Sequence, residues 1–415
     1  MRILVVNCGS ATLKFQLVET DAESARAGTD RALAKGMIDG IGAHPVITFE
    51  AGGRRPLRES AEWLDHASAV EMAIELLAAP GTGVVRHRSE IAAVGHRVVH
   101  GGERFRESAL IDDDVLDGIE AAFDMAPLHN PANVRGYHAA RKALPGVPHV
   151  AVFDTAFHQA MPREAYLYGL PYALYEKYGI RRYGFHGTSH RYVSSRLAAR
   201  LGRAVDDPEL RLVTCHLGNG CSAAAIRGGR SIDTSMGFSP LEGLLMGTRS
   251  GDVDPAALLH VIAREELSLA EANSLLNKQS GLLGLSGIGS DMRKLLDEER
   301  KGNDRAKLAI EVFCYRVKKT IAAYVGVLGG VDGIAFAGGI GENSPAIRAR
   351  VLAGLELLGV VLDPDRNAAA VGVETEITAD DARRRVFAIP TNEELLIARD
   401  TFAIVSRGAD GRDGD

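Results

Sequence analysis

The amino-acid sequence predicts an α/β protein built from two duplicated domains. The opening "ILVVNCGSATLKFQLVE" has the form of a strand, a glycine-containing turn and a second strand, and "LRLVTCHLGNGCSAAAIRGGR" repeats this form in the middle of the chain. Apolar residues recur with a helical period between such strands, as in residues 268–277 and 305–328. A chain of 415 residues is long enough for two domains, and strands that alternate with helices are typical of the α/β class.

The turns of the two predicted hairpins support the duplication. Each carries an asparagine beside a turn glycine, at Asn7 and Asn219, although two short matches can also arise by chance. A third strand and turn, "DGIAFAGGIGEN", leads into a predicted helix over 344–359. Ser344 is suited to the N-cap of this helix and Pro345 to its first turn. Ordinary packing of a strand on a helix would produce the same pattern, so this alternative stays open.

Composition excludes several classes of function. The 48 basic and 54 acidic residues leave a net charge of −6, which argues against nucleic-acid and membrane-surface partners. Four scattered cysteines and an N-terminus without a long apolar run favour a cytoplasmic protein. The weakly charged stretch 321–341 is interrupted by Asp332 and by glycines, so we expect a helix end followed by a strand and no membrane span.

The stretch "TCHLGNGCSAA" at 214–224 raises the question of a metal site. Cys215, His216 and Cys221 lie close together, but structural zinc usually needs two pairs of ligands and no second pair follows. We therefore expect no metal there, and a metal assay would test the alternative of a metal-stabilised structural protein. The glycines are the better clue, because backbone N–H groups at such turns form a concavity that binds anions.

Phosphate binding is the chemistry that the glycine turns favour. The chain contains 46 glycines, about 11% of its residues against the ~7% that is usual. No glycine is followed by lysine, so a Walker A loop is missing, and "GGIGEN" lacks the last glycine of the dinucleotide fingerprint. A nucleotide would have to be bound by another fold.

Isolated polar residues on predicted loops complete the chemistry. Each alone is more often a cap or a surface residue, but together they supply the residue types that phosphoryl transfer requires. His186 and His190 lie four apart without the glutamate of a zinc HExxH motif. The other candidates are Arg97, His129, Asp154, Arg249 and Glu393.

Longer motifs make the chain similar to the acetate kinase family over residues 1 to about 405. They are "VVNCGSATLKF", "GHRVVHGG", "APLHNPAN", "FDTAFHQAMP", "YGFHGTSHRYV", "HLGNG", "SMGFSPLEGLLMGTRSGDVDP", "GGIGEN" and "PTNEELLIARD". That family belongs to the actin, hexokinase and Hsp70-like ATPase superfamily. The resemblance implies two duplicated ribonuclease H-like ATPase domains with an interdomain active-site cleft. We expect the first domain to comprise 1–158 with a returning segment 394–415, and the second to comprise 159–393.

The resemblance also implies the reaction. It is a reversible in-line transfer of a phosphoryl group between ATP and acetate, giving acetyl phosphate and ADP, with Mg²⁺ or Mn²⁺ as the metal. A homodimer and a metabolic link to phosphate acetyltransferase in acetyl-CoA biosynthesis are implied as well. Alternatives are a propionate or butyrate kinase of the same family and, from another class, a non-catalytic actin-like ATP-binding scaffold.

The site residues follow from the resemblance by position. The catalytic residues would be Asp154, His186, Arg249 and the substrate-binding Arg97. The acyl pocket would be formed by Val99, Leu128, Phe185 and Pro240, with His129 nearby. The nucleotide would contact Lys14, the segment His216, Leu217, Gly218, Asn219 and Gly220, the segment Asp291, Met292 and Arg293, and the segment Gly339, Ile340, Gly341, Glu342 and Asn343. Asn7 and Glu393 would be associated with the metal.

Two points limit what the resemblance implies. Similar kinases usually have "GSSSLK" where this chain has "GSATLK", so Ala11 lacks a hydroxyl and a minor contact is in doubt. A carboxylate substrate is ionised at neutral pH and needs no general base, so Asp154 could act as a base or only position Mg²⁺.

Overall fold

The computed structural model describes residues 1–127 and 129–410 and divides the chain into two compact units. Unit 1 comprises Met1–Phe157 and Asn392–Asp415, and unit 2 comprises His158–Thr391. The boundary expected after residue 393 had placed Glu393 in the second domain. The structure assigns it to unit 1, because the helix that begins there packs on the sheet of that unit.

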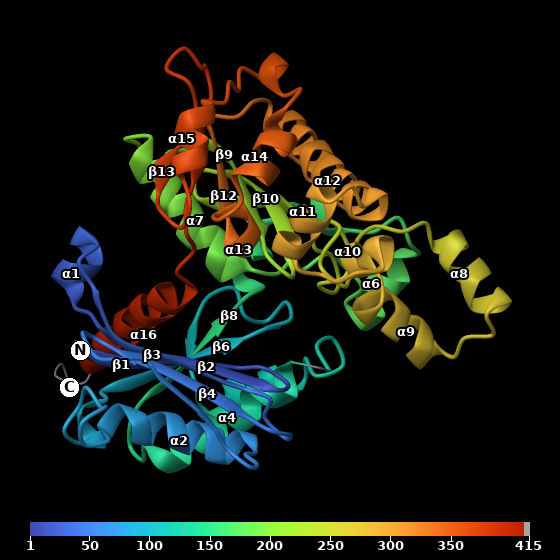
Figure 1. Cartoon of the computed structure of the whole chain (residues 1–415). Coiled ribbons are helices and arrows are strands. Elements are labelled where there is room, and N and C mark those ends of the chain that lie inside the picture. The colour runs from blue at the N-terminus through green and yellow to red at the C-terminus, as the bar shows by residue number, and fades with distance from the viewer. Residues whose placement is uncertain (128, 411–415) are drawn as a thin grey trace. The chain divides into compact units, whose positions relative to one another are not determined.

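Unit 1 is organised around an eight-stranded sheet with the order β5-β4-β3-β2-β1-β6-β8-β7 (Figure 1). Five strands form an antiparallel meander, whereas β1, β6 and β8 are parallel to one another. The bounds are β1 (Arg2–Cys8), β2 (Thr12–Glu19), β3 (Arg31–Asp39), β4 (Val46–Ala51), β5 (Leu57–Ser60), β6 (Ala93–Val98), β7 (Ala109–Leu110) and β8 (His149–Phe153).

Helices cover both faces of this sheet because the side chains of β1 alternate between two cores. Leu4 and Val6 belong to the cluster formed with α2 and α4, whereas Ile3 and Val5 pack with Ile397 of α16. The helices are α1 (Ala22–Ala27), α2 (His66–Ala78), α3 (Asp113–Glu120), α4 (Asn130–Ala143) and α16 (Glu393–Asp410), with 3₁₀ turns at Arg88–Glu90 and Ala156–Ala160.

Unit 2 has a six-stranded sheet with the order β11-β10-β9-β12-β14-β13. Its strands are β9 (Arg211–Leu217), β10 (Cys221–Arg227), β11 (Arg230–Thr234), β12 (Gly333–Ala337), β13 (Thr375–Glu376) and β14 (Arg385–Ala388). The helices are α5 (Arg163–Tyr166), α6 (Tyr172–Tyr178), α7 (Gly187–Arg200), α8 (Pro255–Arg264), α9 (Leu269–Lys278), α10 (Gly281–Ser286), α11 (Met292–Arg300), α12 (Asp304–Leu328), α13 (Gly338–Gly341), α14 (Pro345–Leu352), α15 (Pro364–Ala369) and a 3₁₀ turn at Glu356–Leu358. Of these, α7 packs on β9 and β12, and α12 packs on β9 and β10.

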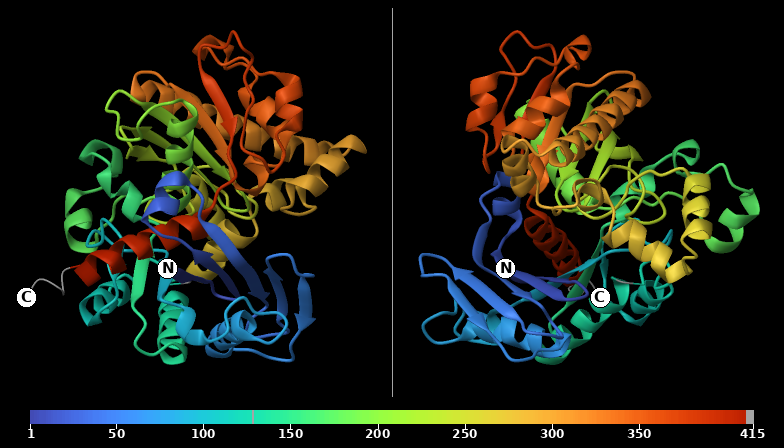
Figure 2. Two further views of the ribbon diagram at one scale, coloured as in Figure 1. Left: turned by 90° about the vertical axis from the view of Figure 1, so that its left-hand side faces the viewer. Right: turned by 45° about the vertical axis from the view of Figure 1, so that its right-hand side comes forward.

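The two sheets repeat one topology, which confirms the predicted duplication. Figure 2 shows the ribbon from two further directions. In unit 1 the order β3-β2-β1-β6-β8 contains two antiparallel pairings followed by two parallel ones. In unit 2 the order β11-β10-β9-β12-β14 contains the same sequence of pairings. The hairpins predicted from the sequence are β1–β2 and β9–β10, which are the first two strands of each repeat in chain order.

The helices follow the local signals of the sequence, with one difference. The helix α9 begins with a capping box between Ser268 and Glu271, and α12 is followed by β12, as the stretch 321–341 predicted. The helix predicted over 344–359 is shorter, because Gly354 adopts a positive φ of 88° two residues after Leu352. No helix in the described part of the chain is both long and apolar enough to cross a membrane.

Candidate active site

Arg97 and Asp154 form the centre of a polar group at the carboxyl ends of β6 and β8. These strands are parallel neighbours, and Asp154 directly follows β8. Arg97 donates from Nε to Asp154 Oδ1 at 3.1 Å and from Nη2 to Asp154 Oδ2, and its Nη1 donates to Asn7 Oδ1 at 3.2 Å. The side chain of Asp154 is only 1% exposed. This two-pronged ion pair fixes the plane of the guanidinium.

Negative charge is in excess around this pair. Burial alone would lower the pKa of Arg97, but Asp154 and Glu393 raise it above its usual value. Burial raises the pKa of the Glu393 carboxyl to about 7, although Arg97 opposes this shift. A carboxylate whose charge is poorly compensated is stabilised by an added cation.

The donor set suits Mg²⁺. The amide oxygen of Asn7 and the carboxylate of Glu393 are hard oxygen ligands, and Mg²⁺ is usually held by one or two carboxylates together with waters and substrate phosphates. Among the described residues, no group of three or more His, Cys, Asp or Glu side chains could hold a metal by itself. This donor set therefore fits a metal that is also held by substrate phosphates and waters.

Two buried asparagines that the sequence analysis did not single out hold the backbone after β6. Asn133 Oδ1 accepts the N–H of Val99 at 3.1 Å, and Asn130 Oδ1 accepts the N–H of His100 at 3.1 Å. Asn133 also donates to the carbonyl of Cys8 at 2.7 Å. The only signal in the sequence was the pair of amides three residues apart in "HNPAN", which places both on one face of the helix.

The predicted nucleotide lysine, Lys14, lies in unit 1. It is the cross-strand neighbour of Asn7 in the β1–β2 pair and lines a cavity of about 280 Å³ with Glu394. It does not line the larger cavity of unit 2 in which most of the other predicted nucleotide contacts are found.

His186 occupies an unusual backbone position in unit 2. It is the N-cap residue of α7 with a φ of 57°, a left-handed conformation that is uncommon for a residue with a side chain and that often occurs at functional sites. Its Nδ1 lies 2.8 Å from Ser222 Oγ, and its ring lies 4.3 Å from the ring of His216. His216 Nδ1 in turn lies 2.7 Å from Ser189 Oγ.

Arg249 faces the same glycine turn as His186. A Cβ atom added to Gly220 would lie 3.4 Å from Arg249 Nη1 and 3.4 Å from His186 Nε2, so these two nitrogen atoms flank the Gly220 backbone. Arg249 Nη1 also donates to the carbonyl of Pro240 at 3.0 Å. Burial lowers the pKa of Arg249, which means that the buried cation is poorly compensated and would be stabilised by an anion.

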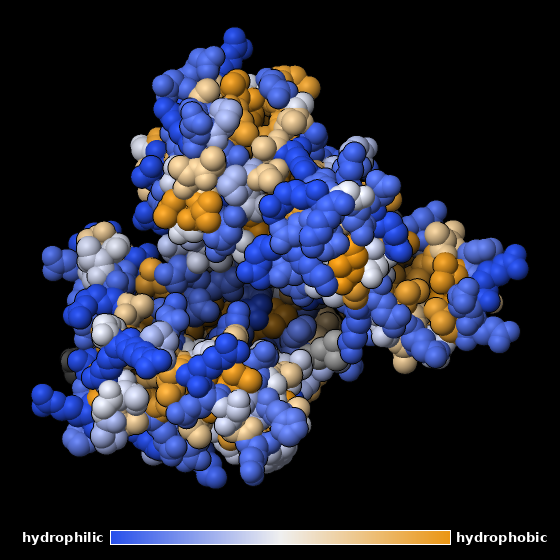
Figure 3. Space-filling view, in the orientation of Figure 1, coloured by the Kyte–Doolittle hydropathy of each residue, from blue (hydrophilic) through white to orange (hydrophobic). Residues whose placement is uncertain are grey.

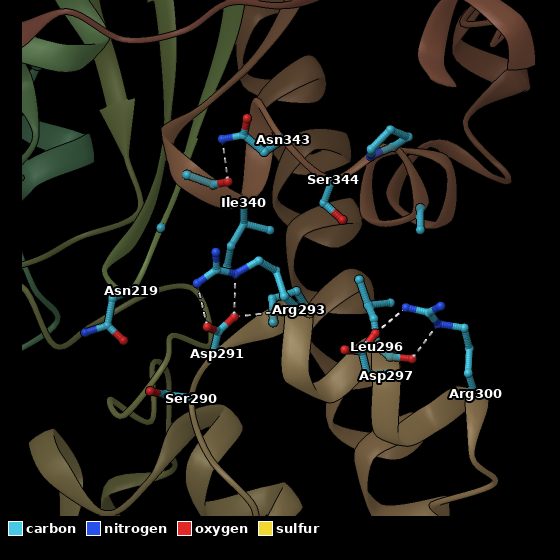
Figure 4. A pocket seen from close by; sticks show the side chains of 15 residues that line it. Asn219, Ser290, Asp291, Arg293, Leu296, Asp297, Arg300, Ile340, Asn343 and Ser344 are labelled. Atoms are coloured by element: carbon cyan, nitrogen blue, oxygen red, sulfur yellow. Dashed lines mark hydrogen bonds and ion pairs between the residues drawn. The ribbon is translucent and has the colours of Figure 1, made fainter. Parts of the chain in front are cut away.

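A cavity of about 740 Å³ lies between the glycine turns and α11 (Figure 4). This volume is within the range of small-molecule sites. Eight predicted nucleotide contacts line it, namely Gly218, Asn219, Asp291, Met292, Arg293, Gly339, Ile340 and Asn343. The sequence analysis missed other lining residues, namely Ser290, Leu296, Asp297, Arg300, Ser344, Pro345 and Ala346. The sequence did contain one signal for two of them: Leu296 and Arg300 follow the predicted contact Met292 at spacings of one helical turn, which places all three on the same face of α11.

The remaining predicted nucleotide contacts lie around the cavity without lining it. Leu217 is buried in β9, Gly341 is buried in α13, and His216 stacks near His186. Gly220 lies against the side chains of both His186 and Arg249, and Glu342 accepts the N–H of Thr391 at 3.3 Å.

The predicted acyl pocket is not assembled within either unit. Val99 is buried in unit 1, whereas Phe185 is buried in unit 2 and Pro240 is half-buried there. Leu128 lies outside the described residues, and His129 is the N-cap residue of α4. This pocket stays a prediction.

Cys215 and Cys221 are buried thiols. Burial raises the pKa of Cys221 to about 12 and raises the pKa of Cys215 as well. Cys221 donates from Sγ to the carbonyl of Gly218 at 3.1 Å. Through this hydrogen bond Cys221 closes the glycine turn.

The fold and these groups of residues define a class: a kinase with two duplicated α/β domains, one with a bidentate arginine site and one with a cavity of nucleotide size. Comparison with known protein families identifies the family within this class. The model of the Acetokinase family matches residues 2–399, and the chain belongs to this family.

Curated relatives and solved structures support the assignment to this family. The acetate kinase of Acetivibrio thermocellus is 50% identical, over 98% of this chain and 99% of its own length. That of Solibacter usitatus is 52% identical, over 98% of each. The crystal structure of Porphyromonas gingivalis acetate kinase matches with a TM-score of 0.91 and 42% identity, covering 97% of this chain and 99% of that one. A propionate kinase from Francisella tularensis matches with a TM-score of 0.89 and 40% identity over the same shares.

Proposed function

We propose that the protein is an acetate kinase that transfers a phosphoryl group reversibly and in line between ATP and acetate. The observation that carries the proposal is the Arg97–Asp154 pair, which presents a fixed guanidinium to a small carboxylate. Relatives that are about half identical over nearly their full length bear the name acetate kinase, which supports the same conclusion.

Arg97 binds the acetate carboxylate and lowers its repulsion from ATP. Acetate is ionised at neutral pH, so it attacks without a general base. Both carboxylate oxygens of Asp154 accept hydrogen bonds from Arg97. Asp154 therefore orients the guanidinium and contributes negative charge beside the metal site, and it does not act as a base.

The unit 2 residues stabilise the charge on the transferring group. Arg249 and His186 direct nitrogen atoms to the Gly220 turn, where donors to the equatorial phosphoryl oxygens would stabilise the transition state. The cavity lined by Asn219, Asp291 and Asn343 holds the nucleotide. Asn7 and Glu393 would hold Mg²⁺, which would neutralise phosphate charge, and Mn²⁺ would replace it because both ions accept oxygen ligands.

The decisive experiment is ADP production by the purified chain, followed by a coupled assay with acetate and Mg²⁺. We expect turnover that depends on both, and acetyl phosphate trapped as its hydroxamate in equal amount. ATP binding without turnover would contradict the proposal and favour a non-catalytic scaffold. A propionate kinase is the second candidate, because one solved structure similar over nearly the whole chain bears that name.

The chain acts as a cytoplasmic homodimer in this proposal, and its acetyl phosphate is passed to a phosphate acetyltransferase for acetyl-CoA biosynthesis. The support for the dimer is an exposed apolar surface on α8 and α9 (Figure 3). No residue of α8 is buried; Leu259 is 67% exposed and Leu269 is 85% exposed. A second copy would cover them. Light scattering on Leu259→Asp should give a monomer where the unmodified chain gives a dimer.

A further inference from the structure

A chain of hydrogen bonds leads from His186 into the core of unit 2. Ser222 Oγ lies 2.8 Å from His186 Nδ1 and 2.8 Å from His190 Nε2. His190 Nδ1 lies 2.8 Å from Thr214 Oγ1 on β9. Ser222, His190 and Thr214 are all buried. The described contacts thus order the groups as His186, Ser222, His190 and Thr214.

The spacing of the two histidines in "YGFHGTSH" is explained by this arrangement. Residues four apart on a helix advance by about 6 Å, and residues two apart on a strand advance by about 6.6 Å. His186, the N-cap residue of α7, and His190 on α7 therefore match His216 and Thr214 on β9, so that each histidine faces its own residue of the strand. Ser222, the cross-strand partner of His216, contacts both histidines of α7.

The direction of the hydrogen bonds determines which nitrogen of His186 carries its hydrogen. A hydroxyl has one hydrogen and donates only once. If Ser222 donates to His186 Nδ1, it accepts from His190 Nε2, and Thr214 donates to His190 Nδ1. In that direction neutral His186 is protonated on Nε2. In the opposite direction His186 donates from Nδ1, and its Nε2 presents a lone pair.

We propose that Thr214, His190 and Ser222 hold His186 as the neutral Nε2–H tautomer, so that it donates a hydrogen bond to the phosphoryl group without being charged. The proposal rests on the proposed function for the identity of that acceptor. Nε2 of His186 and Nη1 of Arg249 flank Gly220, and a lone pair at Nε2 would repel the anion that Arg249 attracts. Ser222, His190 and Thr214 are thus positioning residues for His186.

The surroundings are consistent with neutral rings. Burial lowers the pKa of His190 well below its usual value, and the nearby His158 and His216 lower it further. The described contacts of His186 within unit 2 include three ionisable groups: His190 on α7, reached through Ser222, His216 on β9, and Arg249 from the loop after β11. Arg249 carries a permanent positive charge and disfavours a second one on this imidazole.

Nitrogen-15 NMR of the unmodified chain tests the tautomer directly. In protein labelled with ¹⁵N-histidine at about pH 8, above the unperturbed histidine pKa, the His186 signals are assigned by their loss in His186→Gln. We expect a protonated Nε2 and a bare Nδ1, which resonate far apart. A protonated Nδ1, whether in the opposite tautomer or in an imidazolium, would overturn the proposal. This result does not depend on the substrate, so it is separate from the test of acetate kinase activity.

Kinetics test whether the tautomer matters for turnover. Ser222→Ala should lower kcat roughly tenfold with unchanged KM for ATP. Without the Ser222 hydroxyl, His186 would adopt the other tautomer for part of the time and would then lack its Nε2–H donor. Thr214→Val should lower kcat less, and Thr214→Ser, which keeps the hydroxyl, should restore it. Ser231→Ala is the matched control, because Ser231 is equally buried and lies 2.8 Å from His158 Nδ1. An equal loss in that control, or full kcat in Ser222→Ala, would contradict the proposal.

Discussion

Asp154 accepts hydrogen bonds from two nitrogen atoms of Arg97, across 57 positions of the sequence. The pair exists because β6 and β8 are adjacent and parallel, so that their carboxyl ends bring both side chains to one edge of the sheet. Two features depend on it: the orientation of the Arg97 guanidinium and the compensation of the buried Asp154 carboxylate.

Arg97→Ala should destabilise the protein and weaken acetate binding. Removing one partner of a buried ion pair costs roughly 3–5 kcal/mol, because the other charge is left uncompensated. We expect a lower midpoint in urea denaturation and a higher KM for acetate. The double variant Arg97→Ala/Asp154→Ala should regain much of the stability but none of the acetate affinity. Recovery of both would contradict the role of Arg97 in binding.

Propionate should react less efficiently than acetate. One additional methylene in a small apolar pocket changes specificity by only about 1–3 kcal/mol, so the longer acid is disfavoured without being excluded. The measurement is kcat/KM for acetate, propionate and butyrate in one coupled assay. A clear preference for butyrate would refute the acetate assignment, and equal values for acetate and propionate would favour the propionate kinase alternative.

The sequence revealed individual elements and residues but not their pairing. The hairpins of β1–β2 and β9–β10 follow from local alternation and turn glycines, and both were predicted. Arg97 and Asp154 were found only as separate candidates, because strand order decides which side chains meet and local periodicity does not report it. Asn133 was missed for the same reason, because its side chain accepts the backbone N–H of Val99 from a different element, α4. Arg300 at the nucleotide cavity was missed because a charged residue on a helix is usually a solvated one.

Cys215→Ala/Cys221→Ala should retain most ATP-dependent activity. Both thiols are buried and resist ionisation, so they contribute packing and one weak hydrogen bond rather than metal ligands. Elemental analysis of the unmodified chain should find no stoichiometric zinc. One zinc per chain that is lost in the double variant would restore the metal-site interpretation of this stretch.

Stability should fall as the pH is lowered from about 6.5 toward 4. Burial lowers the pKa of His149 and of His158 to about 4, whereas unfolded histidine titrates near 6.5. Between these values the unfolded state binds more protons, so unfolding becomes easier, by roughly 2 kcal/mol per histidine at pH 5. Urea midpoints at several pH values measure this. His158→Gln should flatten the dependence, whereas substitution of the exposed His44 should not.

Arg249→Ala should lower kcat roughly a hundredfold or more and change the KM for ATP little. In the proposed mechanism Arg249 meets charge that develops on the transferring phosphoryl group, while the cavity lined by Asp291 and Asn343 would hold the nucleotide in the ground state. Arg249→Lys should recover only part of the rate, because an ammonium lacks the planar arrangement of donors, and free guanidine added to the alanine variant should restore some of it.

The competing role of Arg249 is to brace its loop, and its hydrogen bond to the carbonyl of Pro240 makes that role concrete. Bracing predicts a different pattern: Arg249→Ala would lose thermal stability, and ATP affinity would fall in step with turnover. Measuring the melting temperature, the Kd for ATP and kcat on the same preparation separates the two roles. A variant that is stable, binds ATP normally and turns over at the wild-type rate would refute both, because the buried guanidinium would then serve neither the loop nor the phosphoryl group.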